Sequence, residues 1–303
     1  MLMAIRLGPN QYGKAQVHLV RVHRDTPRHE IRDLTVSTSL RGNFSAAHVE
    51  GDQGDVLPTD TQKNTVFAFA KEKGVESPEQ FALELADHFL VTAPVADGAR
   101  IEVEEANWGR IDVDGRGHDH AFVQTGGGTR TAVVNVDGRG ADRTAHVVSG
   151  LKDLVVLKST GSEFHGFLQD RYTTLQETDD RILATSLVAR WRHVGTDTDW
   201  NKSFDGIKAL LLQRFAEIHS KALQQTLYGM GEAVLEQFPD VAEVKFSAPN
   251  KHHFLVDLSP FGVDNPNEVF YAADRPYGLI EASVVRDDAP DAGNAWHSTP
   301  GFC

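Results

Sequence analysis

Runs of residues that are β-branched, or that alternate between apolar and polar side chains, occur in both halves of the chain. Such runs are typical of β-strands, because successive side chains of a strand point to opposite faces. The segments predicted as strands are 16–24, 30–40, 100–105, 130–136, 154–158, 182–192, 242–246, 254–258 and 280–284. Asp25-Thr26-Pro27-Arg28 separates the first two, which predicts a long hairpin, and two copies of Val-Asp-Gly-Arg-Gly, at 113–117 and 136–140, predict exposed hairpin tips.

Four other segments repeat their apolar residues every three or four positions, which is the pattern of an amphipathic helix. The first is expected to begin at a cap near Thr59 or Asp60 and to end at Gly74. The second begins with Ser77-Pro78-Glu79-Gln80, a capping box with proline at the first helical position. The remaining two cover 204–218 and 223–238, and Pro239 ends the last of them.

Each half of the chain therefore consists of strands, then helices, then strands. This order predicts an α+β fold in which an antiparallel unit is duplicated in tandem, with expected domains at 1–145 and 146–303. The segment 286–303 is polar and contains Pro, Gly and Asp, so it is expected to form a loosely held tail.

Composition narrows the class of protein. The chain has 303 residues, of which 40% are hydrophobic and 24% charged, with a mean hydropathy of -0.34, as expected for a water-soluble globular protein. It has no apolar run long enough to span a bilayer and no secretory signal pattern, so no membrane association and a cytoplasmic location are expected. The formal charge of -13 disfavours nucleic acid as a partner. Cys303 is the only cysteine, which excludes an intrachain disulfide and a cysteine-based zinc site.

Candidate sites are weak when each is taken alone. The best metal candidate is His118-Asp119-His120 with His252-His253, but the first motif adjoins Gly115-Arg116-Gly117 and no third ligand is identifiable, so a polar turn is favoured. The stretch 126–129 lacks the ending of a phosphate-binding loop, and the chain contains neither a nucleophile elbow nor a dinucleotide fingerprint. The residues by themselves thus indicate an acidic α+β protein and no substrate.

Several separate motifs, in order along nearly the whole chain, resemble the urate oxidase (uricase) family. They are Asn10-Gln11-Tyr12-Gly13-Lys14, Thr59-Asp60-Thr61-Gln62-Lys63-Asn64-Thr65, the segments 158–167, 172–181 and 223–228, Asn250-Lys251-His252-His253-Phe254-Leu255-Val256-Asp257, and 264–271. The segment 109–146 resembles the family poorly, and Ala248 replaces the leucine usual before Pro249-Asn250.

The resemblance implies the tunnelling fold (T-fold): two antiparallel units per chain, helices on the outer face, and a barrel formed between subunits of a homotetramer. It also implies active sites at subunit interfaces. One chain would contribute Lys14 and Thr59, and its neighbour would contribute Phe164, Arg181, Gln224, Asn250 and His252.

The family's chemistry implies a role for each of these residues, with urate and molecular oxygen as the partners and neither a metal nor an organic cofactor. Arg181 and Gln224 would bind opposite edges of urate, Phe164 would stack beneath it, and the backbone N–H groups of Leu223 and Asp60 would bind ring heteroatoms. Lys14, Thr59 and His252 would relay protons, and Asn250 and Thr59 would hold oxygen. The expected products are 5-hydroxyisourate and hydrogen peroxide.

Two alternatives remain open at this stage. One is a zinc-dependent enzyme acting on purines or pterins, as in the cyclohydrolase branch of the same fold, which the lack of cysteines disfavours. The other is a purine-binding protein without turnover, which would bind urate but consume no oxygen.

Overall fold

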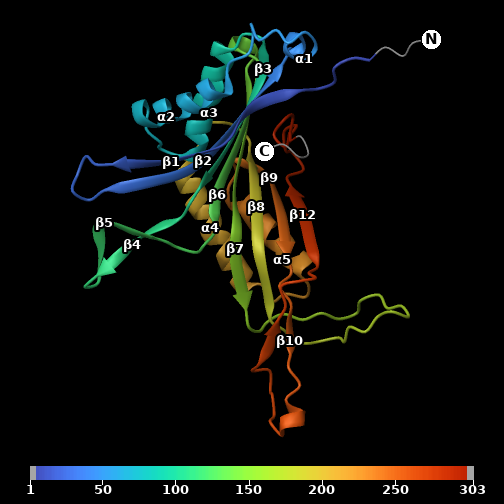
Figure 1. Ribbon diagram of the computed structural model, residues 1–303. Coiled ribbons are helices and arrows are strands. Elements are labelled where there is room, and N and C mark those ends of the chain that lie inside the picture. The colour runs from blue at the N-terminus through green and yellow to red at the C-terminus, as the bar shows by residue number, and fades with distance from the viewer. Residues whose placement is uncertain (1–4, 299–303) are drawn as a thin grey trace. The chain divides into compact units, whose positions relative to one another are not determined.

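The computed structural model describes residues 5–298 (Figure 1). Their packing divides them into two compact units. The first unit extends through Gly150 and includes Arg192–Asn201 and the described residues from Pro290 onward, whereas the second comprises Leu151–Trp191 and Lys202–Ala289. No helix within residues 5–298 is both long and apolar enough to cross a membrane.

The first unit is a sheet with helices packed against it. Its strands follow the order β1 (Gln11–His23), β2 (Glu30–Gly42), β3 (Ala96–Glu105), β6 (Thr129–Asp137) and the first part of β7 (Thr144–Lys158), and β1, β2, β3 and β6 pair antiparallel. The helices are α1 (Ser45–Val49), α2 (Thr59–Glu72) and α3 (Pro78–Thr92), with a short turn η1 (Gly140–Asp142). A separate hairpin joins β4 (Trp108–Val113) to β5 (Arg116–Gln124). The long hairpin predicted at the start of the chain is confirmed as β1 and β2.

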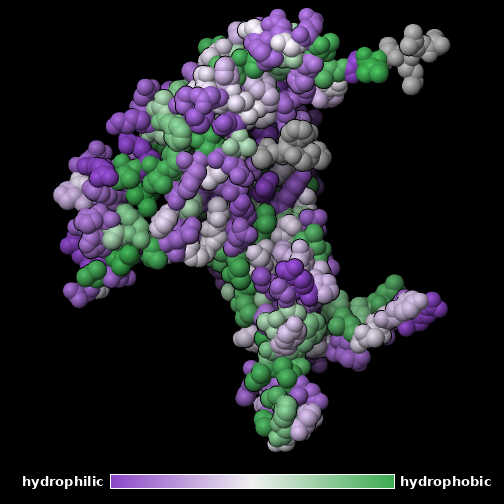
Figure 2. All heavy atoms as spheres, in the orientation of Figure 1, coloured by the Kyte–Doolittle hydropathy of each residue, from purple (hydrophilic) through white to green (hydrophobic). Residues whose placement is uncertain are grey.

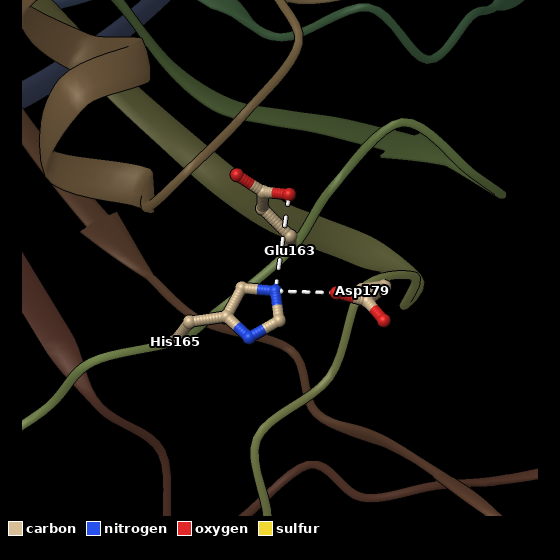
Figure 3. Close-up of side chains that lie close together, drawn as sticks. All are labelled: Glu163, His165 and Asp179. Carbon is tan, nitrogen blue, oxygen red and sulfur yellow. Dashed lines mark ion pairs between the residues drawn. The ribbon is translucent and has the colours of Figure 1, made fainter.

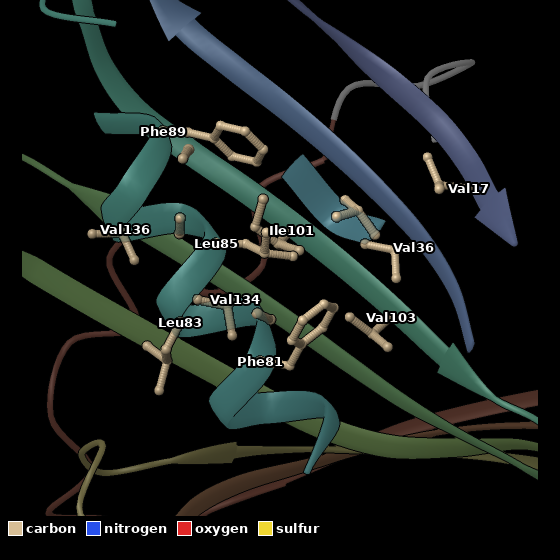
Figure 4. Close-up of a cluster of buried hydrophobic side chains, with 14 of the residues drawn as sticks. Val17, Val36, Phe81, Leu83, Leu85, Phe89, Ile101, Val103, Val134 and Val136 are labelled. Carbon is tan, nitrogen blue, oxygen red and sulfur yellow. The ribbon is translucent and has the colours of Figure 1, made fainter. Parts of the chain in front are cut away.

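Helix α3 covers this sheet because its apolar residues recur every four positions. Phe81, Leu85 and Phe89 lie on one side of the helix and point toward Ile101 and Val134 of the sheet (Figure 4). All five side chains are at most 2% exposed. Each contributes roughly 1.5–3 kcal/mol through its removal from water. The predicted capping box is also confirmed at its first residue, since Ser77 Oγ accepts a hydrogen bond from the Gln80 N–H at 3.1 Å.

A β-bulge interrupts the pairing of β1 with β2 directly after Lys14. The register shifts between Lys14 and Val17, and Gln16 has a φ of 55° in the left-handed region. The strands approach so closely just before the bulge that a Cβ at Gly13 would lie 1.8 Å from the Thr38 carbonyl oxygen. Glycine is therefore required at this position, and the bulge sets the direction of the chain next to Lys14.

The two copies of Val-Asp-Gly-Arg-Gly lie in different structural environments. In the first copy Asp114 and Gly115 have φ values of 52° and 78° and connect β4 to β5, which confirms a hairpin tip. The second copy is not an exposed tip, contrary to the prediction. The Arg139 guanidinium turns inward and donates hydrogen bonds to the carbonyl oxygens of Leu90 and Ala93 at 2.6 and 2.9 Å. The same guanidinium can thus satisfy carbonyls left unpaired at the end of α3.

The prediction of a loosely held tail is wrong for residues 290–298. Ala295 is only 2% exposed and packs with Val133 and Val148, and its carbonyl oxygen accepts a hydrogen bond from the Asn135 side chain at 3.4 Å. Asn294 donates to Asp137 at 2.9 Å. This segment therefore belongs to the first unit, while Cys303 lies outside the described residues.

The second unit repeats the combination of sheet and paired helices. The remainder of β7, then β8 (Leu183–His193), β9 (Val241–Pro249) and β12 (Leu279–Val285) are neighbours in that order. The helices α4 (Trp200–Glu217) and α5 (Leu223–Gln237) bury Ile207, Leu211, Leu227 and Val234 in its core. Two short strands, β10 (His253–Leu255) and β11 (Phe270–Ala272), pair outside this sheet, with the turn η2 (Ser259–Phe261) between them. The predicted antiparallel α+β class is confirmed. Of the strand expected at 254–258, only residues 254 and 255 are in a strand, as part of β10.

Gly231 in α5 is expected to be required for packing against β12. A Cβ there would lie 2.6 Å from Val284 Cγ2 and 3.1 Å from the Phe246 ring, and both side chains are buried. In Gly231→Ala the clash should cost about 1–3 kcal/mol, while the better helix propensity of alanine should return up to about 1 kcal/mol. We therefore expect a net decrease in the free energy of unfolding. Chemical denaturation measures the change.

Gly229→Ala is the matched control in the same helix, because its Cβ would meet only the movable end of the Ile218 side chain, at 2.9 Å. This variant should be neutral or stabilised. Equal stability of the two variants would show that α5 and β12 can separate without cost.

Candidate functional site

A cavity of about 280 Å³ lies within the second unit, between the segment 164–182 and the segment 250–255. Four residues singled out from the sequence line it together, although up to 88 positions separate them along the chain: Phe164, Arg181, Asn250 and His252. The combination of a cation, an aromatic ring, an amide and an imidazole suits a flat ligand with several polar edges.

Arg181 is held in a defined orientation by Ser162. The backbone N–H of Arg181 donates to the Ser162 carbonyl oxygen at 2.8 Å, and Arg181 Nε donates to Ser162 Oγ at 3.3 Å. No residue within 5–298 accepts a hydrogen bond from its two terminal nitrogens, so these nitrogens can donate in parallel to a ligand. Partial burial lowers the pKa of the guanidinium, which nonetheless stays charged at neutral pH.

Phe164 provides a flat apolar surface next to this cation. The Arg181 Cζ atom lies 5.1 Å from the centroid of the ring, and the Phe167 ring stacks on Phe164 at 5.0 Å with an interplanar angle of 13°. The backbone is fixed by reciprocal N–H to C=O bonds between Phe164 and Thr178, at 2.9 and 3.1 Å. The ring is therefore held by both side-chain and backbone contacts.

Asn250 and His252 lie where β9 ends. The Asn250 N–H donates to the Gly278 carbonyl at 2.8 Å, and the next residue, Lys251, donates to the Ala184 carbonyl at 2.8 Å. The His252 ring stacks on Phe254 at 5.7 Å with an angle of 19°. The Ala273 N–H also donates to the His252 carbonyl oxygen at 2.9 Å, so the backbone of both residues is held at the cavity.

The imidazole of His252 is neutral near neutral pH. Burial lowers its pKa, and the positive charges of Arg181 and His253 lower it further. A neutral imidazole has one nitrogen that accepts a proton and one that donates, so His252 can pass a proton in either direction.

Helix α5 begins next to the segment that holds Arg181, because Ser162 and Ser220 form a parallel bridge. Leu223 is 3% exposed and Gln224 is exposed, and neither lines the cavity. The Ala222 cap has no side-chain hydrogen bond, and the first bond of the helix runs from the Thr226 N–H to the Ala222 carbonyl at 3.1 Å. The backbone N–H groups of Leu223 and Gln224 thus precede the hydrogen-bonded turns and favour an anion.

Lys14, Thr59 and Asp60 belong to the first unit. Thr59 is the first residue of α2, but the cap is Pro58, so the prediction of a side-chain cap at Thr59 or Asp60 is wrong. The Asp60 carboxylate instead accepts hydrogen bonds from Lys63 and, at 3.0 Å, from Asn64. Its pKa is lowered by the hydrogen bond and charge of Lys63, by Asn64, and by the charge of Lys14. Lys14 and Asp60 therefore lie within electrostatic range of each other.

Sequence reasoning missed Ser162, which is fully buried and orients Arg181. A small polar residue inside the motif 158–167 was the only signal for it. The histidine motif at 118–120 also differs from expectation, because it lies within strand β5 and not in a turn, with the His118 and His120 rings 4.5 Å apart.

The fold is that of an antiparallel α+β protein, and the terminal guanidinium nitrogens of Arg181 and the Phe164 ring of its cavity suit a flat ligand with hydrogen-bond acceptors. Comparison with known proteins is consistent with this class. The family model described as Uricase matches residues 10–135 and 147–281, and the chain belongs to that family. The match includes 109–135, which was expected to resemble the family poorly, and leaves out 136–146.

Named relatives match over nearly their full length. The chain is 53% identical over 297 residues to the uricase of Arthrobacter globiformis, covering 98% of this chain and 95% of that protein. It is 35% identical over 280 residues to the uricase of Danio rerio, covering 91% and 93%. The crystal structure of the Arthrobacter globiformis uricase superposes with a TM-score of 0.91 over 97% of this chain and 99% of that one. A Bacillus fastidious uricase structure, at 23% identity and a TM-score of 0.80, supports the fold alone. The expected T-fold of the chain, with antiparallel sheets and helices, is thereby confirmed. The barrel between subunits stays a prediction.

The lowered pKa of His252 leads to a prediction for the pH dependence of activity. If neutral His252 accepts a proton during turnover, kcat/KM should fall with decreasing pH only below the usual histidine pKa of about 6.5. The reason is that protonated His252, which cannot accept a proton, becomes abundant only below the lowered pKa of this imidazole. Steady-state rates between acidic and neutral pH measure this limb.

His252→Gln should remove the acid limb, whereas His253→Gln should retain it, since His253 Nδ1 is already paired with the Lys251 carbonyl at 2.9 Å. An acid limb at or above the usual histidine pKa would contradict the assignment.

Proposed function

We propose that this chain is a urate oxidase that converts urate, molecular oxygen and water to 5-hydroxyisourate and hydrogen peroxide. The reaction balances: urate is oxidised by two electrons, oxygen takes both electrons and two protons, and water supplies the hydroxyl group. The observation that supports it most is the joining of Arg181, Phe164, Asn250 and His252 in one cavity of a uricase-family chain.

Urate binding would use complementary edges. The two terminal nitrogens of Arg181 would donate in parallel to one edge of the anion, and the Gln224 amide would pair with the opposite edge. Phe164 would lie beneath the rings. Backbone N–H groups of Leu223 and Asp60 would complete the frame, and the lack of a side-chain cap at the start of α5 supports the first of these.

Proton transfer and oxygen placement would be the protein's remaining tasks. Lys14, Thr59 and His252 would carry the proton removed from urate, and the neutral state of His252 supports this role. Asn250 and Thr59 would hold oxygen, and then water, above the ring plane. The urate dianion supplies the electrons itself, so we propose that neither a metal nor an organic cofactor takes part.

We further propose that the active enzyme is a cytoplasmic homotetramer with its sites between subunits, Lys14, Thr59 and Asp60 coming from one chain and the Arg181 cavity from its neighbour. In the assembly, T-fold units of adjacent chains would join into a barrel. Exposed apolar side chains near β10 and β11, at the lower end of Figure 2, support an interface: Phe254, Leu255, Phe261, Val263 and Val269 are 49–77% exposed.

The decisive experiment mixes the purified chain with urate in air-saturated buffer. We expect loss of the near-ultraviolet absorbance of urate together with equal amounts of oxygen consumed and peroxide formed. Full activity after exhaustive chelation would exclude the zinc-dependent alternative. Urate binding without oxygen uptake would instead establish a purine-binding protein and refute the proposal.

A further inference from the structure

Two histidines and two carboxylates converge beside Phe164, on residues to which the proposed reaction gives no role. His165 Nε2 lies 2.8 Å from Asp179 Oδ1 and 3.9 Å from Glu163 Oε2 (Figure 3). His219 Nε2 lies 3.5 Å from the same Glu163 oxygen. We refer to these four residues as the His165 cluster.

Backbone pairing holds the members of the His165 cluster together, although they come from three segments of the chain. The Glu163 N–H donates to the Ser220 carbonyl at 2.8 Å, which keeps His219 next to Glu163. The reciprocal bonds between Phe164 and Thr178 do the same for His165 and Asp179, because each is the next residue along the chain. The four side chains are thus brought together by bonds that do not depend on their own charges.

The spacing fits a small divalent cation. Zinc binds imidazole nitrogen and carboxylate oxygen at about 2.0–2.2 Å, so ligand atoms of a tetrahedral site lie roughly 3.3–3.6 Å apart. The distances of 3.5 and 3.9 Å to Glu163 are close to this value, and the hydrogen-bonded pair of His165 and Asp179 must open only slightly. Within residues 5–298, Glu163, His165 and Asp179 form the one group in which three such ligand atoms lie within 4.8 Å of each other.

The charge and the solvent exposure of the His165 cluster also favour a divalent cation. The two carboxylates together neutralise the charge of a divalent cation. The His165 and His219 side chains are 36% and 59% exposed, so an ion can reach them from solvent. In ordinary surface ion pairs each carboxylate contacts one histidine. Here both imidazoles approach the same Glu163 oxygen.

We propose that the His165 cluster binds one divalent cation of the zinc type per chain, with Glu163, His165 and Asp179 as ligands. His219 lies 3.5 Å from the Glu163 oxygen but not within 4.8 Å of all three, so its ring must turn toward the ion to become the fourth ligand. The ion is not part of the oxidation chemistry. It ties the segment around Phe164 to the segment around Thr178 and to the turn before α5, so its binding restrains the ring on which urate is proposed to stack. Only this last consequence depends on the proposed function.

The test is calorimetric titration of the metal-free full-length protein with zinc chloride, in the absence of urate. We expect one equivalent per chain. His165→Gln and His219→Gln should each weaken binding by about 100-fold, the upper end of the range seen even for residues that only orient ligands. Cobalt(II) should give the intense visible absorption of a tetrahedral site, and zinc should slow hydrogen exchange at the Phe164 and Thr178 amides.

His18→Gln is the matched control, because His18 is 65% exposed and pairs with a single carboxylate, Asp33, at 2.6 Å. It should bind zinc like the parent. Unchanged affinity in both cluster variants, or an equal loss in the His18 variant, would overturn the proposal. Since no urate is present, failure of the chain to oxidise urate would leave the result standing.

Discussion

Replacing Arg181 with alanine is expected to raise the KM for urate by about a thousandfold and to change kcat much less. In the proposed complex this residue donates two charge-assisted hydrogen bonds, each worth roughly 1.5–3 kcal/mol. A loss of about 4 kcal/mol corresponds to about three powers of ten in affinity. Steady-state kinetics and urate binding under anaerobic conditions measure the two quantities separately.

Two further variants test whether the paired donors of Arg181 cause the expected change in KM. Arg181→Lys keeps the charge but loses the planar pair of donors, so its KM should lie between those of the parent and the alanine variant. Arg171→Ala removes an arginine from the same segment, whose guanidinium lies 4.6 Å from the exposed Tyr172 ring. Its KM should be unchanged. A reduced kcat with normal urate affinity in Arg181→Ala would contradict a binding role.

Replacing Lys14 with methionine is expected to reduce kcat by about 10² to 10⁴ while urate affinity stays within a few-fold of the parent. That factor is the usual contribution of a well-placed proton carrier. Methionine keeps an unbranched stem of similar length but cannot take up a proton. Anaerobic urate binding and the rate of a single turnover on adding oxygen test both halves of the expectation.

Lys71→Met serves as the control, because Lys71 is an exposed lysine near the end of α2 and should be dispensable. Co-assembled Lys14→Met and Arg181→Ala chains provide a second check. If the site is shared between subunits, some interfaces in the mixture combine two intact halves and activity returns. Weakened urate binding in Lys14→Met, or no recovery in the mixture, would refute the division of roles.

Short sequence motifs and the spacing of apolar residues were sufficient to predict much of the fold. The Ser77 cap followed from a short motif, and the four-residue spacing of Phe81, Leu85 and Phe89 identified the face of α3 that packs on the sheet. Contacts between distant segments were beyond such rules. The Ala295 carbonyl is bound by Asn135, 160 positions earlier, so composition alone made the segment look unattached. Arg139 lies in a repeat that reads as a turn, and only its tertiary setting directs it inward.

The site was less predictable than the fold. Phe164, Arg181 and His252 share no periodic pattern, and each alone was more typical of an ordinary core or surface residue. Their selection came from the family resemblance, and the cavity that unites them arises from the ends of separate strands and loops. Ser162 escaped notice because a hydrogen bond from Arg181 Nε to a neighbouring hydroxyl has no signature in residue order.

The missing cap of α5 has a consequence for attempts to make this protein more robust. A serine or aspartate in place of Ala222 would normally add about 1 kcal/mol to a helix by covering the amides of its first turn. Here the added side chain would accept from the Gln224 or Gln225 N–H and lie beside the Leu223 N–H that urate is proposed to use. An aspartate there would also place a negative charge where the urate anion is proposed to bind, so we expect thermostabilisation at Ala222 to lower urate affinity.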